Sequence, residues 1–447
     1  MAAPAPLTLP SGAGEFDAVV DGTDRLRRSV LPSGVRVLTQ RTPGAHSATV
    51  GFWVPVGSRD EVAGEFGSTH FLEHLLFKGT KTRSALDLAV GFDEVGADSN
   101  AVTAKEYTCY YARCRAEDVP RSVRLMSDMV MASMIPADQF DPEREVILEE
   151  LAAAADDPGD VVQERFTQAL FGDSGLGRPI GGTPQTIQAA TRDGVLSHYH
   201  RHYRAGNLVV AAAGAVDHDR ICELVQAACE AAGWEAPEGP APRPSITPAA
   251  AGATPVPVDA LVRDSEQVNL ILGGRALRAS DPDRFALSVW STLFGGGVSS
   301  RMFQELREKR GLVYTAYSFA SLYRDAGLFG LFAATRPSKA PMVAALLREL
   351  AHDFAATGPS TEEVALATGQ MVGAMTLALE DTHARMARLG RAEIGSGVLY
   401  DLPASVAAVR AVTAADVARV ASGMLDAPLS LCSVGPVSAE ELGAAAD

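Results

Sequence analysis

The sequence lacks the features that mark secreted, disulfide-rich or membrane-spanning proteins. Its five cysteines contain no Cys-x-x-Cys pair, and an odd, scattered set is typical of a reducing compartment, where thiols act as small buried side chains. Residues 1–22 have no basic region followed by an apolar run, so no secretory signal is expected. No apolar stretch approaches the length that spans a bilayer. We therefore expect a cytoplasmic protein without a membrane partner.

Basic residues are scarce relative to acidic ones. The chain has 39 Lys and Arg against 55 Asp and Glu, a formal net charge of −16. A nucleic-acid partner is not expected, because binding it requires a basic face that neutralises phosphates. Aromatic residues reach only 6%, but hydrophobic residues make up 47%, which is ample for packed interiors. Basic or amphipathic peptides remain a suitable class of ligand.

A chain of 447 residues is too long for one ordinary core, and its length favours two to three domains. The clearest boundary is the Pro- and Ala-rich stretch 236–260, whose composition favours a semi-stiff linker. We therefore predict a flexible N-terminal arm at 1–24, a first domain at 25–235 and a second domain at 261–447.

The order of predicted elements repeats on the two sides of this linker. Before it we expect strands at 35–38 and 47–56, helices at 67–77 and 85–95, a strand pair at 101–113 and a helix at 119–134. After it we expect a strand at 267–273, helices at 285–294 and 300–309, a hairpin at 312–334 and a helix at 337–354. This arrangement indicates an α+β fold of two related domains, each a mainly antiparallel sheet covered by helices.

The pentapeptide His70-Phe71-Leu72-Glu73-His74 is the most informative part of the sequence. Residues four apart on an α-helix lie about 40° apart around the axis, so His70 and His74 can direct two imidazoles at one ion. Glu73 lies about 60° from His70 on the other side, where it can contact a ligand of that ion without binding it. This inverted order occurs in zinc-peptidase motifs. A pair of hydrogen-bonded core histidines is the alternative.

A catalytic zinc requires three protein ligands, and the third is expected to be an acid on a neighbouring element. The segment 141–155 strongly favours a helix. On it Glu150 lies within about 20° of Glu143 and shares an inward face with Val146, whereas Glu149 points away. We predict Glu150 as a metal ligand and Glu143 as a carboxylate that contacts a ligand or the water. A solvated acidic helix, the alternative, accounts poorly for Glu150.

The motif and its surroundings resemble the pitrilysin/insulinase family of zinc peptidases, specifically bacterial members of its processing-peptidase branch. Glu150 follows His74 by 76 residues, and the segments GSTHFLEHLLFKGT, SNAVTAKEYTCYYA, PEREVILEEL and FGDSGLGRPIGGT occur in the family's order. The resemblance extends over residues 26–434. It implies Zn2+ held by His70, His74 and Glu150, Glu73 as general base, and two homologous α/β-roll domains, the first catalytic and the second in contact with substrate.

The resemblance also assigns residues to substrate. In the family an Arg and a Tyr at the spacing of Arg307 and Tyr314 reach the substrate or the developing oxyanion, although spacing alone favours an ordinary solvated helix and strand start. Asn100 and Ala101 match the strand beside the zinc, and a peptide could pair with it as one more strand. Because one chain carries both parts, we expect a homodimer in which each metal site faces the other protomer's Arg307 and Tyr314.

Two further patterns receive no site. The three glycines at 295–297 are not followed by Gly-Lys-Ser/Thr, so a flexible turn is expected there instead of a phosphate loop. The His-rich run 197–203 is expected to close a helix and lead into a strand at 208–212.

The sequence therefore predicts a zinc-dependent endopeptidase that hydrolyses peptides or extended precursor segments inside a closed chamber. A catalytically silent scaffold or peptide-binding subunit of the same fold is the alternative. The intact set of His70, Glu73, His74 and Glu150 argues against it, because a silent subunit has no need of all four.

Overall fold

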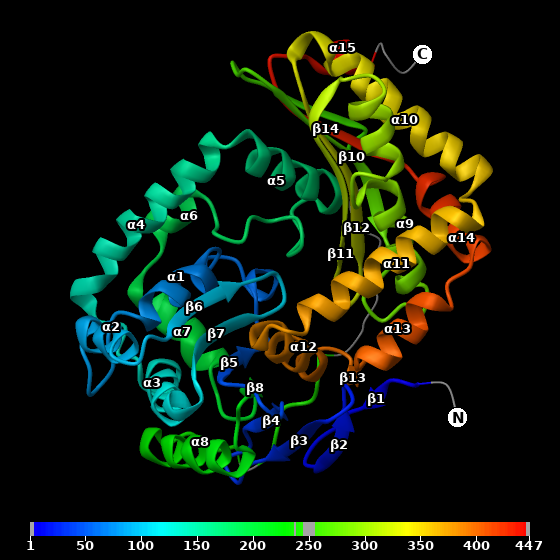
Figure 1. Ribbon diagram of the computed structural model, residues 1–447. Helices are drawn as coiled ribbons and strands as arrows, with labels where there is room; N and C mark the ends of the chain where they lie inside the picture. The colour runs from blue at the N-terminus through cyan, green and yellow to red at the C-terminus, as the bar shows by residue number, and fades with distance from the viewer. Residues whose placement is uncertain (1–3, 237, 245–254, 444–447) are drawn as a thin grey trace. The chain divides into compact units, whose positions relative to one another are not determined.

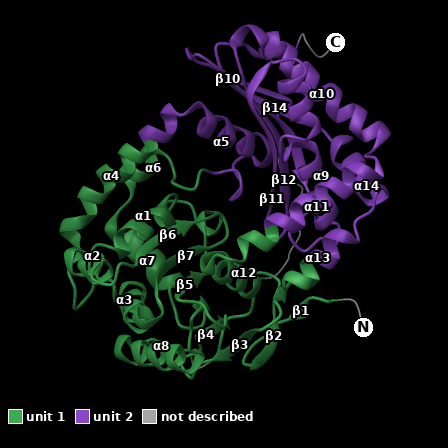
Figure 2. Ribbon diagram, in the orientation of Figure 1, with its two compact units in different colours: residues 1–151, 179–245, 375–405 green, residues 152–178, 246–374, 406–447 purple. Residues whose placement is uncertain are grey.

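A computed structural model describes residues 4–236, 238–244 and 255–443 (Figure 1). The chain forms two compact units and enters each of them more than once (Figure 2). Unit 1 comprises residues 1–151, 179–245 and 375–405, and unit 2 comprises residues 152–178, 246–374 and 406–447. Each unit contains a mainly antiparallel sheet covered by helices, so the predicted α+β class with two related domains is confirmed.

Unit 1 contains a seven-stranded sheet whose neighbours are antiparallel except for the parallel pair β4–β8. The strands in spatial order are β2 (Phe16–Val20), β3 (Asp24–Val30), β4 (Arg36–Arg41), β8 (Val209–Gly214), β5 (Ser47–Val54), β7 (Thr108–Arg115) and β6 (Asp98–Thr103). The predicted strand pair at 101–113 is the hairpin β6–β7, and β6 is an edge strand.

The structure differs from the prediction in the N-terminal arm, and part of the predicted linker lies outside the described residues. The expected arm at 1–24 contains β1 (Leu7–Thr8), which pairs with β13 (Val398–Leu399), and β2, which pairs with β3 because its alternate residues turn inward. Residues 237 and 245–254 of the expected linker lie outside the described residues, and β9 (Val258–Val262) begins before the predicted end of the linker.

Both faces of the unit 1 sheet are covered by helices. These helices are α1 (Ser68–Leu76), α2 (Ala85–Asp93), α3 (Val119–Ala132), α7 (Arg192–His202), α8 (His218–Ala232) and α12 (Thr382–Ile394). Along β8, Val210 and Ala212 pack into the core that contains α1, α3 and α8, whereas Val209 and Ala211 pack with α12. A strand covered on both faces requires a continuous apolar run, which VVAAAG supplies.

The helix α12 comes from the second half of the sequence and packs closely on the unit 1 sheet. The indole N–H of Trp53 lies 3.2 Å from Met386 Sδ. Gly390 permits this close approach, because a Cβ there would lie only 2.2 Å from the Trp53 ring. Small residues at a contact allow helix and sheet backbones to come together without voids.

A buried ionic cluster fixes the end of α12. The carboxylate of Glu393 is fully buried and accepts hydrogen bonds from Arg28 at 3.0 and 3.1 Å and from Arg243 at 2.9 Å. Arg36 lies 3.5 Å away, and burial lowers the pKa of its guanidinium to about 10. Buried charges are tolerated only when they are paired, so Glu393 is required by the three arginines around it.

Unit 2 contains a five-stranded sheet in the order β11 (Val313–Leu322), β12 (Gly327–Thr335), β10 (Val268–Ala276), β14 (Ser430–Gly435) and β9. One face packs on α5 (Pro158–Phe171), a helix from the first half of the sequence, through Phe166 and Leu170. Trp290 of α9 (Arg284–Gly295) stacks against Phe294 and meets Phe329 of β12 edge-on. The helices α10 (Ala340–Thr357) and α14 (Ala414–Leu425) complete this layer.

Among the described residues, no helix combines the length and apolar character needed to cross a membrane.

The second half follows the predicted order of elements, except that the helix expected at 300–309 is mostly a short π-helix, η3 (Phe303–Glu308).

The buried ionic cluster gives a stability prediction. Replacing the buried acid, Glu393→Gln, leaves three arginines without their counter-charge and is expected to destabilise unit 1 by about 3–5 kcal/mol. Urea unfolding followed by circular dichroism measures the change. The matched control is Asp17→Asn, which breaks an exposed pair with Arg25 and should barely move the unfolding midpoint. Equal effects of the two variants would contradict the assigned role of Glu393.

Candidate metal centre

The helix α1 carries both predicted histidine ligands, and its start is fixed by an unusual cap. Gly67 precedes the helix with φ of 91°, a conformation that favours glycine. The carboxylate of buried Glu61 accepts hydrogen bonds from the N–H groups of Gly67 and Thr69, each at 2.8 Å. A carboxylate at a helix N-terminus satisfies free donors and opposes the positive end of the helix dipole. The apolar residues of α1 are fully buried, so the helix has little freedom to rotate.

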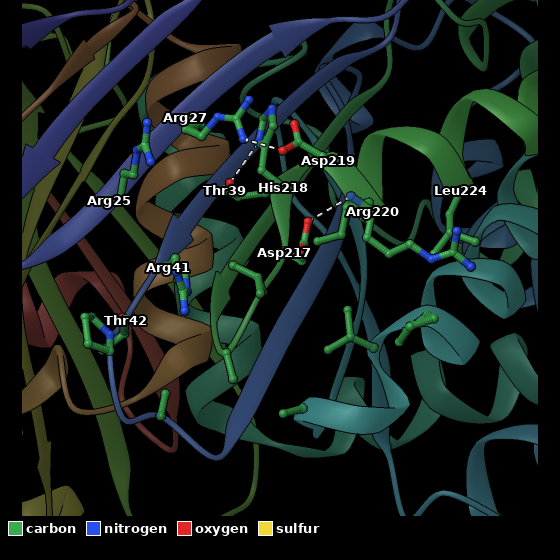
Figure 3. A pocket seen from close by; sticks show the side chains of 18 of the residues that line it. Arg25, Arg27, Thr39, Arg41, Thr42, Asp217, His218, Asp219, Arg220 and Leu224 are labelled. Carbon is green, nitrogen blue, oxygen red and sulfur yellow. Dashed lines mark hydrogen bonds and ion pairs between the residues drawn. The ribbon is translucent and has the colours of Figure 1, made fainter.

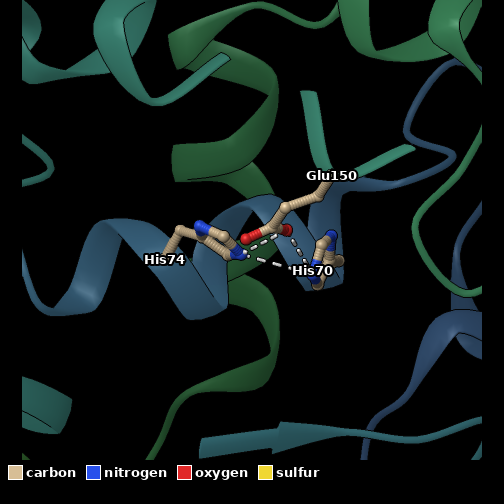
Figure 4. A group of neighbouring side chains, drawn as sticks. All are labelled: His70, His74 and Glu150. Carbon is tan, nitrogen blue, oxygen red and sulfur yellow. Dashed lines mark hydrogen bonds and ion pairs between the residues drawn. The ribbon is translucent and has the colours of Figure 1, made fainter. Parts of the chain in front are cut away.

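The predicted ligand atoms converge from α1 and α4 (Ala137–Asp156), as Figure 4 shows. His74 Nε2 lies 3.3 Å from His70 Nε2 and 3.4 Å from Glu150 Oε2, and His70 Nε2 lies 3.8 Å from the same oxygen. Two ligand atoms bound at 2.0–2.1 Å to a tetrahedral zinc are separated by about 3.3 Å. Among the described residues this is the one group of three side chains whose ligand atoms meet in this way. The set therefore fits a catalytic zinc that keeps an open position.

The protonation state of His70 suits metal binding. Burial, together with the neighbouring His74, lowers the pKa of His70 to about 4, so its imidazole is neutral. Its Nδ1 is buried and has no hydrogen-bond partner among the described residues. Neutral imidazole is the form that binds a metal.

The second histidine is held by a relay of charged groups. Nδ1 of His74 lies 2.9 Å from Glu143 Oε1, and Lys78 Nζ lies 2.6 Å from the other oxygen of Glu143. Glu143 is buried, with 5% of its surface exposed, so Lys78 supplies the counter-charge that its burial requires. Glu143 thereby accepts a hydrogen bond from the Nδ1–H group and directs Nε2 towards the cluster, which is how a supporting carboxylate orients a metal-binding histidine.

Glu73 lies on α1 outside the ligand cluster. Burial raises the pKa of its carboxyl, and hydrogen bonds from Thr103 oppose this rise. The Thr103 hydroxyl donates to Glu73 Oε2. A carboxylate beside the metal cluster, with a raised pKa, has the properties of a general base.

The orientation of α4 brings the Glu150 carboxylate to the histidines and differs from the prediction at Val146. The buried stripe of α4 contains Phe140, Glu143 and Ile147, whereas Val146 is 44% exposed. Successive residues turn by 100°, so a stripe that includes residues 143 and 147 leaves residue 146 well to one side. Glu150 lies at the margin of this stripe, with 51% of its side chain exposed, and its carboxylate turns back to the histidines.

The residues predicted to contact substrate lie in both units. Asn100 and Ala101 lie on the edge strand β6 of unit 1, and the Asn100 side chain accepts a hydrogen bond of 2.8 Å from the Ala101 N–H. Arg307 and Tyr314 belong to unit 2 and contact each other. The guanidinium of Arg307 donates to the Tyr314 carbonyl at 2.8 Å and lies 5.1 Å from its ring centroid, while the Tyr314 side chain is largely exposed.

The two patterns that received no site have structural roles. His198 is fully buried on α7, with Nε2 3.3 Å from the Thr69 hydroxyl, and burial lowers its pKa to about 3. Gly295 ends α9 where a Cβ would lie 2.3 Å from the Ser318 backbone nitrogen. Close packing therefore explains this glycine.

A separate hollow of about 550 Å³ in unit 1 is lined by β3, β4 and the start of α8 (Figure 3). Three of its arginines are paired with acids: Arg25 with Asp17, Arg27 with Asp219, and Arg220 with Glu223. His218 is hydrogen-bonded at both ring nitrogens, to Thr39 and Ser29. Most of its polar groups are thus satisfied within the protein, and the ligand cluster of Figure 4 remains the stronger candidate site.

Sequence reasoning missed Glu61, Lys78 and Thr103. Each acts through a contact between elements, and no spacing along the chain pairs Lys78 with Glu143 or Thr103 with Glu73. The only local signal for the role of Lys78 is its position four residues after His74, about one helical turn further along the chain.

Comparison with protein families identifies the chain. Residues 36–184 match the family described as Insulinase (Peptidase family M16), and residues 189–371 match the one described as Peptidase M16 inactive domain. An "Uncharacterized zinc protease" of Streptomyces coelicolor is 44% identical over 422 residues, covering 93% of this chain and 91% of that protein. A protein of the same description from Mycobacterium tuberculosis is 41% identical over 411 residues, covering 92% and 93%.

Solved structures share the fold. A crystal structure from Pseudomonas fluorescens, described as a peptidase M16 inactive domain, superposes with a TM-score of 0.82 at 22% identity and covers 93% of this chain and 99% of that chain. A protease from Helicobacter pylori superposes with a TM-score of 0.79 at 20% identity, covering 95% and 100%.

The ligand geometry distinguishes two adjacent acids on α4. Glu150→Gln removes a charged ligand and is expected to lose stoichiometric metal after dialysis, whereas Glu149→Gln, which changes an exposed acid outside the cluster, should retain it. Metal content is measured by inductively coupled plasma mass spectrometry. Metal retained at the wild-type level in Glu150→Gln would exclude Glu150 as a ligand.

The relay to His74 gives a second prediction. Glu143→Gln is expected to weaken metal affinity by about 10–100-fold, because the His74 ring loses the anion that orients it. Lys78→Met should weaken it in the same direction, since Glu143 then lacks its counter-charge. Competition with a fluorescent chelator measures the affinity, and the exposed acid Glu145 supplies the control, Glu145→Gln. An unchanged affinity in Glu143→Gln would refute the relay.

Proposed function

The chain belongs to the insulinase family, peptidase family M16, and we propose that it is a zinc-dependent endopeptidase that hydrolyses peptides or extended precursor segments. The observation that carries this proposal is the convergence of His70, His74 and Glu150 with Glu73 beside them. Bound zinc would supply Lewis-acid activation of water and of the scissile carbonyl. The inverted His-x-x-Glu-His order is that of a peptidase motif.

In this proposal Glu73 performs the proton transfers. Its carboxylate takes a proton from the attacking water and delivers it to the leaving amine. The roles are supported by its raised pKa and by its position on α1 between the two ligand histidines in sequence. Glu143 holds the proton at His74 Nδ1 and so keeps Nε2 available to the metal.

The edge strand β6 is the proposed binding strand for the peptide. An unpaired edge offers main-chain N–H and C=O groups to an extended peptide, which adds as one more strand. The Asn100 side chain covers the Ala101 N–H in the free protein. A peptide carbonyl would take over this donor and release the Asn100 amide to contact the peptide.

Arg307 and Tyr314 are proposed to bind the peptide or stabilise negative charge on the tetrahedral intermediate. Their mutual contact and the exposure of Tyr314 support a joint role. We further propose a homodimer that encloses a chamber, in which the metal site of one protomer works with Arg307 and Tyr314 of the other. The cytoplasm is the proposed compartment, which agrees with five free cysteines.

The alternative proposal is a silent scaffold or a subunit that binds peptides without cleaving them. Half-buried Glu73 and the relay of Lys78, buried Glu143 and His74 favour catalysis, because desolvated charges are costly and a scaffold gains nothing from their arrangement.

Removing the base tests the proposed function. Glu73→Gln should retain zinc but lower peptide hydrolysis by about 10²–10⁴-fold, because the amide cannot accept the proton. Cleavage of a quenched fluorescent peptide and metal analysis measure the two effects, with Glu149→Gln as the matched control. Full activity in Glu73→Gln would refute the base assignment.

Mixing Glu73→Gln chains with Arg307→Ala chains tests whether each active site uses residues of both protomers. Partial recovery of activity supports such shared sites, and no recovery contradicts them.

A further inference from the structure

Thr103 is the last residue of β6 and contacts the Glu73 carboxylate. No other residue of this strand, within the described part of the chain, is recorded in contact with that carboxylate. The Thr103 hydroxyl donates a hydrogen bond to Glu73 Oε2. Thr103 is half-buried, whereas Asn100 and Val102 on the opposite face of the strand are exposed. The edge strand and the helix α1 are therefore joined at the carboxylate.

The hydrogen-bond pattern of the hairpin shows which groups of β6 face the open edge. The Ala104 N–H donates to the Tyr107 carbonyl at 2.8 Å and closes the β6–β7 turn. In antiparallel pairs, hydrogen-bonded and non-hydrogen-bonded positions alternate, and Thr103 pairs with Thr108 at the next position. The main-chain groups of Thr103, and of Ala101 two residues earlier, therefore point away from β7 towards the open edge.

Ala101 and Thr103, two of the residues of β6 that face the open edge, differ in their hydrogen bonds. The Ala101 N–H is covered by the side chain of its neighbour Asn100, which a peptide carbonyl can displace. The hydroxyl of Thr103 is bound to Glu73, a side chain of α1. A peptide that pairs with β6 at Ala101 therefore reaches the end of the strand at Thr103, where the hydroxyl holds the Glu73 carboxylate.

We propose that Thr103 is a positioning residue that anchors the Glu73 carboxylate at the end of the peptide-binding strand and so fixes the register between the bound peptide and the general base. This inference rests on the proposed peptidase function. The strand that aligns the peptide also aligns the group that activates the water, so a shift of one affects the other. A displacement of about 1 Å in a catalytic group lowers a rate by about 100-fold, so loss of the Thr103 hydroxyl is expected to lower kcat.

Two substitutions distinguish the effect of the Thr103 hydroxyl from the effect of its side-chain shape. Thr103→Val keeps the branched shape and removes the hydroxyl, and Thr103→Ser keeps the hydroxyl and removes a methyl group. We expect kcat of Thr103→Val to fall by about 10–100-fold with KM changed less than about threefold. Thr103→Ser should stay within a few-fold of the wild type. Zinc affinity, measured by chelator competition, should be unchanged in both variants.

Several results would overturn the proposal. An undiminished kcat in Thr103→Val would exclude the positioning role, and an equal loss in Thr103→Ser would indicate packing instead. A loss confined to KM or to zinc affinity would assign Thr103 to peptide or metal binding. If Thr103→Val unfolds at a lower temperature than the wild type, Thr103→Ala replaces it with the same expectations.

The failure of this inference is distinguishable from failure of the proposed function. Wild-type protein that binds zinc and cleaves the peptide, together with an active Thr103→Val, overturns the role of Thr103 alone. Wild-type protein that contains zinc but cleaves no peptide overturns the peptidase function, and with it the inference that depends on it.

Discussion

The crossing of α1 and α4 is the contact on which the candidate chemistry depends. It brings two imidazoles from one helix and a carboxylate from another within 3.3–3.8 Å of one another. Side chains hold both helices in place: Glu61 caps the start of α1, and Glu143 links α4 to His74. A site that must hold its atoms within a few tenths of an ångström needs this kind of support from its second layer of residues.

Much of the site could be predicted from local sequence, because helical geometry converts spacing into direction. His74 lies four residues after His70, and Glu150 lies seven residues after Glu143, so both pairs share a face by simple rotation. The same reasoning went wrong at Val146, which is exposed. Rotation tells which residues lie together, but the packing partner decides where the buried stripe is centred.

The contacts that hold the site could not be predicted, because they join elements distant in sequence. Lys78 reaches Glu143, and Thr103 reaches Glu73, only after a helix and a strand have been packed together. For the same reason, the segments that make up each unit could not be predicted from the sequence. No helix was predicted at residues 382–394, and only the contacts with Trp53 and Arg28 show which sheet α12 covers.

The reciprocal use of α5 and α12 has a consequence for how this chain can be divided. The sheet of unit 2 is covered on one face by α5 from before the linker, and the sheet of unit 1 by α12 from after it. A polypeptide cut between residues 245 and 254 would yield two fragments, each with one bare sheet face and one orphaned helix. Such fragments would be insoluble apart and would recover a native core only by complementing each other, so neither half is a module that recombination could transfer alone.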